Sequence, residues 1–61
     1  MWTDAKAEKP PEGKIVIARV RLRSGRLALY VARLEHNGTW SLQGWIYERA
    51  PIVHSWMHVP E

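Results

Sequence analysis

The residues with the clearest capacity for chemistry are two histidines in the stretch VHSWMHVPE, residues 53–61 of this 61-residue chain. On a helix, His54 and His58 would share a face and could hold one zinc ion, as the histidines of an HExxH site do. Ser55 stands where such a site has its glutamate, so the general base is missing. The spacing alone therefore does not indicate a metalloenzyme.

The composition around these histidines favours a strand over a helix, because Ile52 and Val53 are β-branched and Pro60 ends the run. On a strand, residues four apart lie on one face about 13 Å apart, at roughly 3.3 Å per residue. A zinc ion has ligand bonds of about 2 Å and cannot bridge that span. We therefore expect no metal site and no cofactor, and we expect Trp56 to be buried.

Nothing else in the chain points to catalysis. The sequence has no cysteine, and it has no recognisable nucleophile–base pair, metal cluster or phosphate-cradling glycine loop. Gly38 and Gly44 are isolated. The sequence predicts that the protein is not an enzyme.

A more informative set of residues is a group of arginines around Ser24–Gly25. In KIVIARVRLR, residues 14–23, the residues alternate with a period of two, which predicts a strand with one buried face. RLALYVARLE, residues 26–35, follows as a second strand. If Ser24–Gly25 is a two-residue loop, one face of this hairpin is wholly apolar and the other is basic. The predicted partner-binding residues on the basic face are Arg19, Arg21, Arg23, Arg26 and Tyr30.

The alternative is a three-residue loop with a glycine bulge. It would place Arg26 beside Leu22 and spoil the separation of the two faces, so we favour the two-residue loop.

The basic face admits several functions. Arginine forks suit carboxylates and phosphates, so an acidic host protein and nucleic acid are both candidate partners, and Tyr30 could stack on a base. A solvated face that deters aggregation is the alternative without a partner. A structural or self-assembling protein, including a homodimer, also stays open, because a core this thin leaves apolar surface to cover.

The remaining segments complete a small β domain. The Asn37–Gly38 pair predicts a type I′ hairpin turn, residues 39–42 a third strand and residues 52–59 a fourth, whereas residues 43–51 are irregular. We expect one domain over residues 1–61: an extended, proline-rich N-terminal segment, residues 1–13, and a sheet, residues 14–61. The fold class is mainly β, with α+β as the alternative, and the architecture is an antiparallel meander of three to four strands.

Composition adds a size limit and a setting. A domain this short buries only about 60% of its unfolded surface, and four tryptophans compensate with large apolar side chains. The net charge is +3, which favours acidic partners. No apolar run approaches the roughly 20 residues of a membrane span, and the N-terminus lacks the apolar region of a signal peptide. We expect a cytoplasmic protein that does not contact the membrane.

Several short motifs resemble a family of small phage and prophage proteins of unknown function. They are Trp2, PPEG at residues 10–13, IVIA at 15–18, NGTW at 37–40 and the tail VHSWMHVPE. The resemblance implies a compact, mostly β fold and a phage or prophage setting inside a host cell, but no reaction.

The chain departs from that family at several positions. Lys9 replaces the usual leucine, His54–Ser55 replaces a threonine–histidine pair, and His58 replaces a proline. The family histidine before the tryptophan is therefore absent, and no role is carried over for it.

Overall fold

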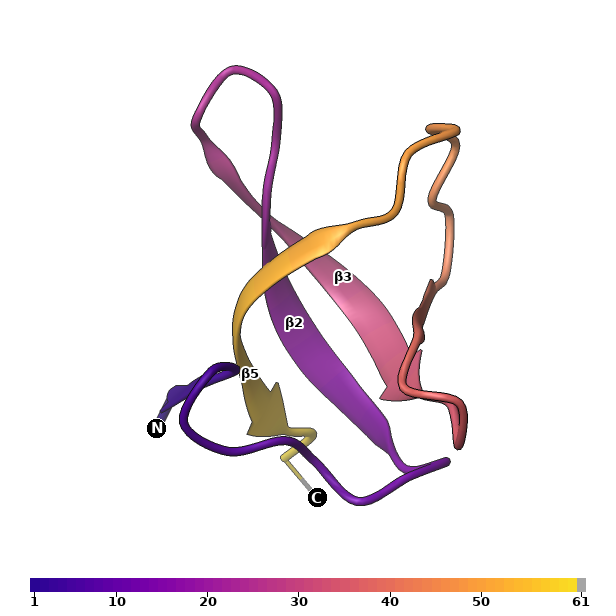
Figure 1. The fold of residues 1–61 in the computed structure, drawn as a ribbon. Coiled ribbons are helices and arrows are strands. Elements are labelled where there is room, and N and C mark those ends of the chain that lie inside the picture. The colour runs from indigo at the N-terminus through magenta and orange to yellow at the C-terminus, as the bar shows by residue number, and fades with distance from the viewer. Residues whose placement is uncertain (61) are drawn as a thin grey trace.

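The protein folds into one antiparallel sheet, seen in a computed structural model that describes residues 1–60 (Figure 1). None of these residues is helical. The mainly β fold class is thus confirmed. The strands are β1 (Thr3–Asp4), β2 (Ile15–Arg21), β3 (Leu27–Leu34), β4 (Trp40–Leu42) and β5 (Ile52–His58).

The strand order is β1-β5-β2-β3-β4. β2, β3 and β4 pair with their sequence neighbours, as expected. β5 does not pair with β4: it crosses back and lies between β2 and β1, so the simple meander is wrong for the last strand (Figure 1). The irregular segment 43–51 permits this return, and the N-terminal segment adds β1 to the outer edge of β5.

The β2–β3 hairpin has a three-residue loop, so the expected two-residue loop is wrong. The Leu22 N–H donates to the Arg26 carbonyl at 2.8 Å, and the Gly25 N–H donates to the Leu22 carbonyl at 2.9 Å. A two-residue type I′ turn needs positive φ at both central residues, whereas in residues 1–60 only glycines have positive φ. Gly25, with φ 90°, supplies the one left-handed residue that the longer loop requires.

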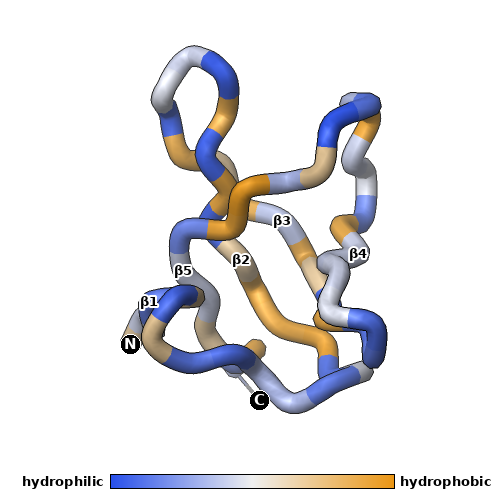
Figure 2. Tube along the Cα trace, viewed as in Figure 1, coloured by the Kyte–Doolittle hydropathy of each residue, from blue (hydrophilic) through white to orange (hydrophobic). Residues whose placement is uncertain are grey.

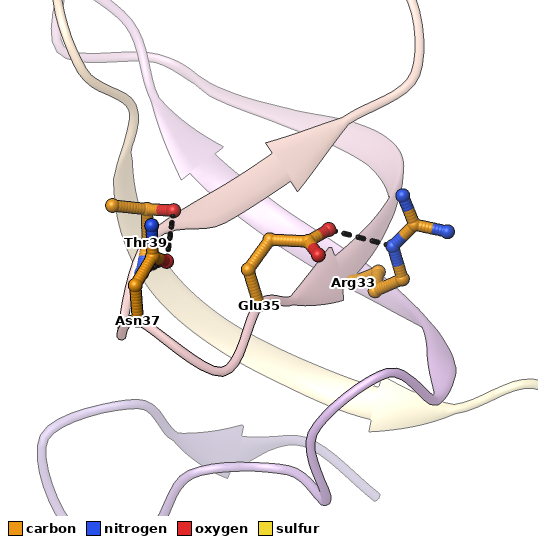
Figure 3. A network of polar contacts seen from close by, with 4 residues as sticks. All are labelled: Arg33, Glu35, Asn37 and Thr39. Carbon is orange, nitrogen blue, oxygen red and sulfur yellow. Dashed lines mark hydrogen bonds and ion pairs between the residues drawn. The ribbon is translucent and has the colours of Figure 1, made fainter.

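The second hairpin, between β3 and β4, is built in the same way. The Glu35 N–H donates to the Thr39 carbonyl at 2.8 Å across the three-residue loop 36–38. Gly38 has φ 88° and Asn37 does not have positive φ, so the turn is not type I′. Figure 3 shows the Asn37 Oδ1 atom accepting from Thr39 Oγ1 at 2.7 Å, beside an ion pair between Arg33 and Glu35.

The core lies on one face of the sheet and is centred on Val16, Ala18 and Val20 of β2. Figure 2 shows that β2 carries a hydrophobic stretch, drawn in orange. Trp56 is 2% exposed, which confirms the prediction that it is buried. Its Nε1 atom donates to the Glu8 carbonyl at 2.8 Å and so ties β5 to the N-terminal segment. The buried core residues are Ala5, Val16, Ala18, Val20, Ala32, Leu42 and Trp56.

Candidate functional site

The three-residue loop changes which side chains of β3 share a face with the arginines. Arg19 lies opposite Leu29, and Arg21 lies opposite Leu27. The expected register placed Arg19 opposite Tyr30 and is off by one residue, which exchanges the two faces of β3. Tyr30 therefore lies on the core face, with its ring edge-on to Trp45 at 5.5 Å between centroids.

The face opposite the core, called the outer face below, is therefore mixed rather than purely basic. Leu29 is 66% exposed and Ile52 is 58% exposed, and both are cross-strand neighbours of arginines of β2. The register places these residues of β2, β3 and β5 on the outer face: Ile15, Ile17, Arg19, Arg21, Leu27, Leu29, Val31, Arg33, Ile52 and Met57.

Arg19 is held by the fold. Its Nε atom donates to the buried Ser55 Oγ atom at 2.7 Å, and its guanidinium lies over the Trp2 ring at 4.2 Å from the centroid. The side chain is only half-exposed. Its main role is to tie the N-terminal segment to the sheet, and neither partner could be identified from sequence spacing.

The other predicted arginines cluster at the hairpin end of the sheet. Arg21 is on the outer face, Arg23 lies in the loop, and Arg26, opposite Leu22, is on the side of the core. Arg21, Arg23 and Arg26 are exposed, and the Arg21 Nη1 atom donates to the Gly25 carbonyl at 3.3 Å. The ion pair formed within residues 1–60 is elsewhere, between Arg33 and Glu35 at 2.7 Å. Arg21, Arg23 and Arg26 form no ion pair within residues 1–60, so they concentrate positive charge at this end of the sheet.

Two hollows lie beside arginines, one near the hairpin and one at the opposite end of β3. The larger, of about 570 Å³, lies between the hairpin loop and residues 47–49, and two arginines and one glutamate line it. It is lined by Leu22, Arg23, Ser24, Tyr47, Glu48 and Arg49.

The smaller hollow, of about 170 Å³, opens on the outer face where β3 meets β4. Its size suits one partner side chain. It is lined by Ile15, Val31, Ala32, Arg33, Ser41 and Gln43.

The C-terminal histidines lie on β5, which confirms that this segment is a strand. His54 lies at a bulge, and its Nδ1 atom is 3.0 Å from Ser55 Oγ. The His58 ring packs edge-on against Trp56 at 5.1 Å. Within residues 1–60, no three His, Cys, Asp or Glu side chains gather as metal ligands do. That no metal binds stays a prediction.

The described part of the chain contains no helix with the length and apolar character needed to cross a membrane. Comparison with protein-family models, with curated proteins and with solved structures found no match. The resemblance to small phage and prophage proteins therefore stays a prediction.

Proposed function

We propose that this protein is a non-enzymatic binding module that holds an acidic protein partner against its outer face. The observation that carries the proposal is the pattern of exposed aliphatic side chains among arginines, with Leu29 66% and Ile52 58% exposed. Burial of these side chains would favour association, and the arginines would select a partner with carboxylates.

The mixed face favours a protein partner over nucleic acid. Protein interfaces combine an apolar centre with enriched arginine, whereas interfaces with DNA are more polar and much more positively charged. Leu27, Leu29 and Val31 would face phosphates without a favourable contact. Tyr30, the residue expected to stack on bases, packs against Trp45 on the other side of the sheet.

The geometry also suggests where the partner is held. The hollow between β3 and β4, of about 170 Å³, offers a place for one apolar anchor side chain. Arg21, Arg23 and Arg26 are exposed at the hairpin end of the sheet, away from this hollow, and Arg21 is on the outer face. A partner that fills the hollow and places carboxylates near the hairpin would use both features of the face.

The setting remains part of the proposal. The motifs at Trp2, at residues 10–13 and in the C-terminal tail support a phage or prophage accessory protein that acts in the cytoplasm of its host. A second copy is a poorer partner for the outer face, because two such faces would bring their arginines together.

The test is affinity capture from a host lysate with matched variants. Leu29→Glu places a carboxylate on the outer face, whereas Ile46→Glu makes the same change at an 82% exposed residue in the 43–51 segment. We expect an acidic protein to be retained by the wild type and by Ile46→Glu, and lost with Leu29→Glu. Retention of the same protein by Leu29→Glu, with the fold intact, would rule the outer face out.

The capture is repeated with added duplex DNA and at raised salt. An acidic protein partner should be weakened by salt, because the arginines contribute, but random DNA should not compete for it. If DNA displaces the captured protein, or is itself the retained species, the nucleic-acid alternative is correct.

A further inference from the structure

β3 has an unpaired edge next to the outer face. The whole of β2 pairs with β3, from Leu27 to Arg33. β4 pairs only with the end of β3, residues 32–34. Within the described chain, the one backbone contact that extends this pairing is the Gln43 N–H, which donates to the Val31 carbonyl at 2.9 Å. Residues 27–30 therefore have a neighbouring strand on one side only.

The backbone groups that face this edge follow from the hairpin. The Leu22–Arg26 pair is hydrogen-bonded, and bonded pairs alternate along an antiparallel ladder. Ala28 and Tyr30 thus direct their N–H and C=O groups to β2, while Leu27 and Leu29 direct theirs outward. The outward Val31 carbonyl, which accepts from Gln43, fits the same alternation.

The edge lacks the usual protection against strand pairing. Natural sheets blunt such edges with proline, lysine or inward-pointing charge, but LALYV at residues 27–31 contains none of these. Arg26 precedes the edge and Arg33 follows it. An extended segment docked here would meet the N–H and C=O groups of Leu27 and Leu29, with Arg26 at one end and Arg33, which is paired with Glu35, at the other.

We propose that the acidic partner adds a strand of its own to the β3 edge. This inference rests on the proposed function and specifies how the same partner binds. The segment is about four residues long, matching the length of 27–30, and runs for about 14 Å. Its backbone pairs with Leu27 and Leu29, and its side chains alternate between the two sides of the sheet. The apolar side chains extend the outer face, and the carboxylates lie on the other side, where Arg26 is.

A second copy of the chain fits this edge less well. Edge pairing of two copies over residues 27–30 would bring Arg26 of each copy near Arg33 of the other. Arg33 is paired with Glu35, but Arg23 and Arg26 form no ion pair within residues 1–60, so positive charge would still meet at both ends. The charge of the edge therefore favours an acidic occupant.

The probe is a synthetic peptide of four Glu-Val repeats with blocked ends, and four Lys-Val repeats serve as the charge-reversed control. Amide hydrogen exchange of the labelled protein is followed by NMR at millimolar peptide. At about 90% occupancy, exchange at Leu27 and Leu29 should slow about tenfold. Ala28 and Tyr30, already bonded to β2, should change little, and the Lys-Val peptide should have no effect.

A second arm blocks the backbone directly in chemically synthesised protein. N-methylation of Leu29 removes the outward N–H but keeps the side chain, and it should abolish binding of the Glu-Val peptide without lowering the melting temperature. N-methylation of Ile46, which is 82% exposed and away from the edge, should leave binding intact.

The outcomes separate this inference from the proposed function. Peptide binding that shifts the methyl signals of Ile52 and Met57, but leaves Leu27 and Leu29 exchanging at their free rates, overturns strand addition and leaves the outer face as the site. If the Glu-Val peptide does not bind at all, strand addition is overturned. The proposed function fails separately, in the capture experiment, if Leu29→Glu retains the captured protein. If the Leu27 and Leu29 amides are protected from exchange in the free protein, and this protection disappears on dilution, a second copy of the chain occupies the edge. That result overturns the proposal that an acidic partner binds there.

Discussion

The register of the β2–β3 hairpin predicts opposite consequences for two neighbouring residues, Leu29 and Tyr30. Leu29 is 66% exposed on the outer face, so about a third of its side chain is buried. Full burial of a leucine contributes about 1.5–3 kcal/mol, and Leu29→Ala should therefore cost about 0.5–1 kcal/mol. Tyr30 packs on the core and meets Trp45 edge-on at 5.5 Å.

Truncation of Tyr30 should cost considerably more. A fully buried aromatic loses about 3–5 kcal/mol on truncation to alanine, and Tyr30 is half-buried. Its aromatic pair adds about 0.5–1.5 kcal/mol, so we expect Tyr30→Ala to cost about 2–3 kcal/mol. In a domain of this size, each kcal/mol lowers the melting temperature by about 4–8 °C.

Thermal unfolding of both variants, followed by circular dichroism under identical conditions, decides between the registers. The observed register predicts a fall of about 2–8 °C for Leu29→Ala and of about 8–24 °C for Tyr30→Ala. With the two-residue loop, Leu29 would lie in the core and Tyr30 on the surface, and the order would reverse. A larger loss for Leu29→Ala would therefore refute the mixed outer face.

Other changes test the fold around that hairpin. Trp56→Ala should cost about 3–5 kcal/mol, because it empties a core position that is 2% exposed and removes the donor to the Glu8 carbonyl; a melt within a few degrees of wild type would show that this ring is dispensable. Gly25→Ala should cost about 1–2 kcal/mol, because alanine disfavours the φ of 90° at this position. Steric clash should add nothing, since no atom lies within 4 Å of the added Cβ. Gly25→Asn is the matched control, because asparagine tolerates this conformation better, and an equal loss of stability in both variants would argue against a conformational origin. Calorimetric titration with zinc should reveal only weak surface binding, and a stoichiometric sub-micromolar site that disappears in His54→Ala would contradict the expected absence of metal.

Much of the fold could be predicted from the sequence. The alternation in residues 14–23 and the β-branched residues at 52–53 predict strands from local composition alone, and β2 and β5 lie there. The glycines of both hairpins also mark turns correctly. These signals are local, so they do not depend on which strands become neighbours.

The length of the β2–β3 loop could not be predicted from the sequence. Ser24–Gly25 is compatible with two loops that differ by one residue, and a one-residue shift moves every side chain of β3 to the other face. The apparent advantage of separated faces favoured the wrong loop. The deciding constraint was conformational, because Ser24 does not adopt the positive φ that the shorter loop requires.

The long-range contacts of the candidate site could not be read from spacing. Arg19 is held by Ser55, which lies 36 residues after it in the sequence, and by Trp2, near the N-terminus. That contact exists because β5 returns beside β2, and a period of two does not specify a partner strand. The same return gives the outer face its Ile52 side chain.

The most direct test of the proposed function is the dissociation constant of the captured protein partner for wild type, Leu29→Ser and Arg21→Ser. An acidic protein held by the mixed face should lose at least about tenfold in affinity, about 1.4 kcal/mol, with Leu29→Ser. Arg21→Ser should weaken binding most at low salt, where its charge is least screened. If Leu29→Ser binds as wild type does while only Arg21→Ser weakens binding, charge alone recognises the partner and the exposed leucines and isoleucines play no part, contrary to the proposal.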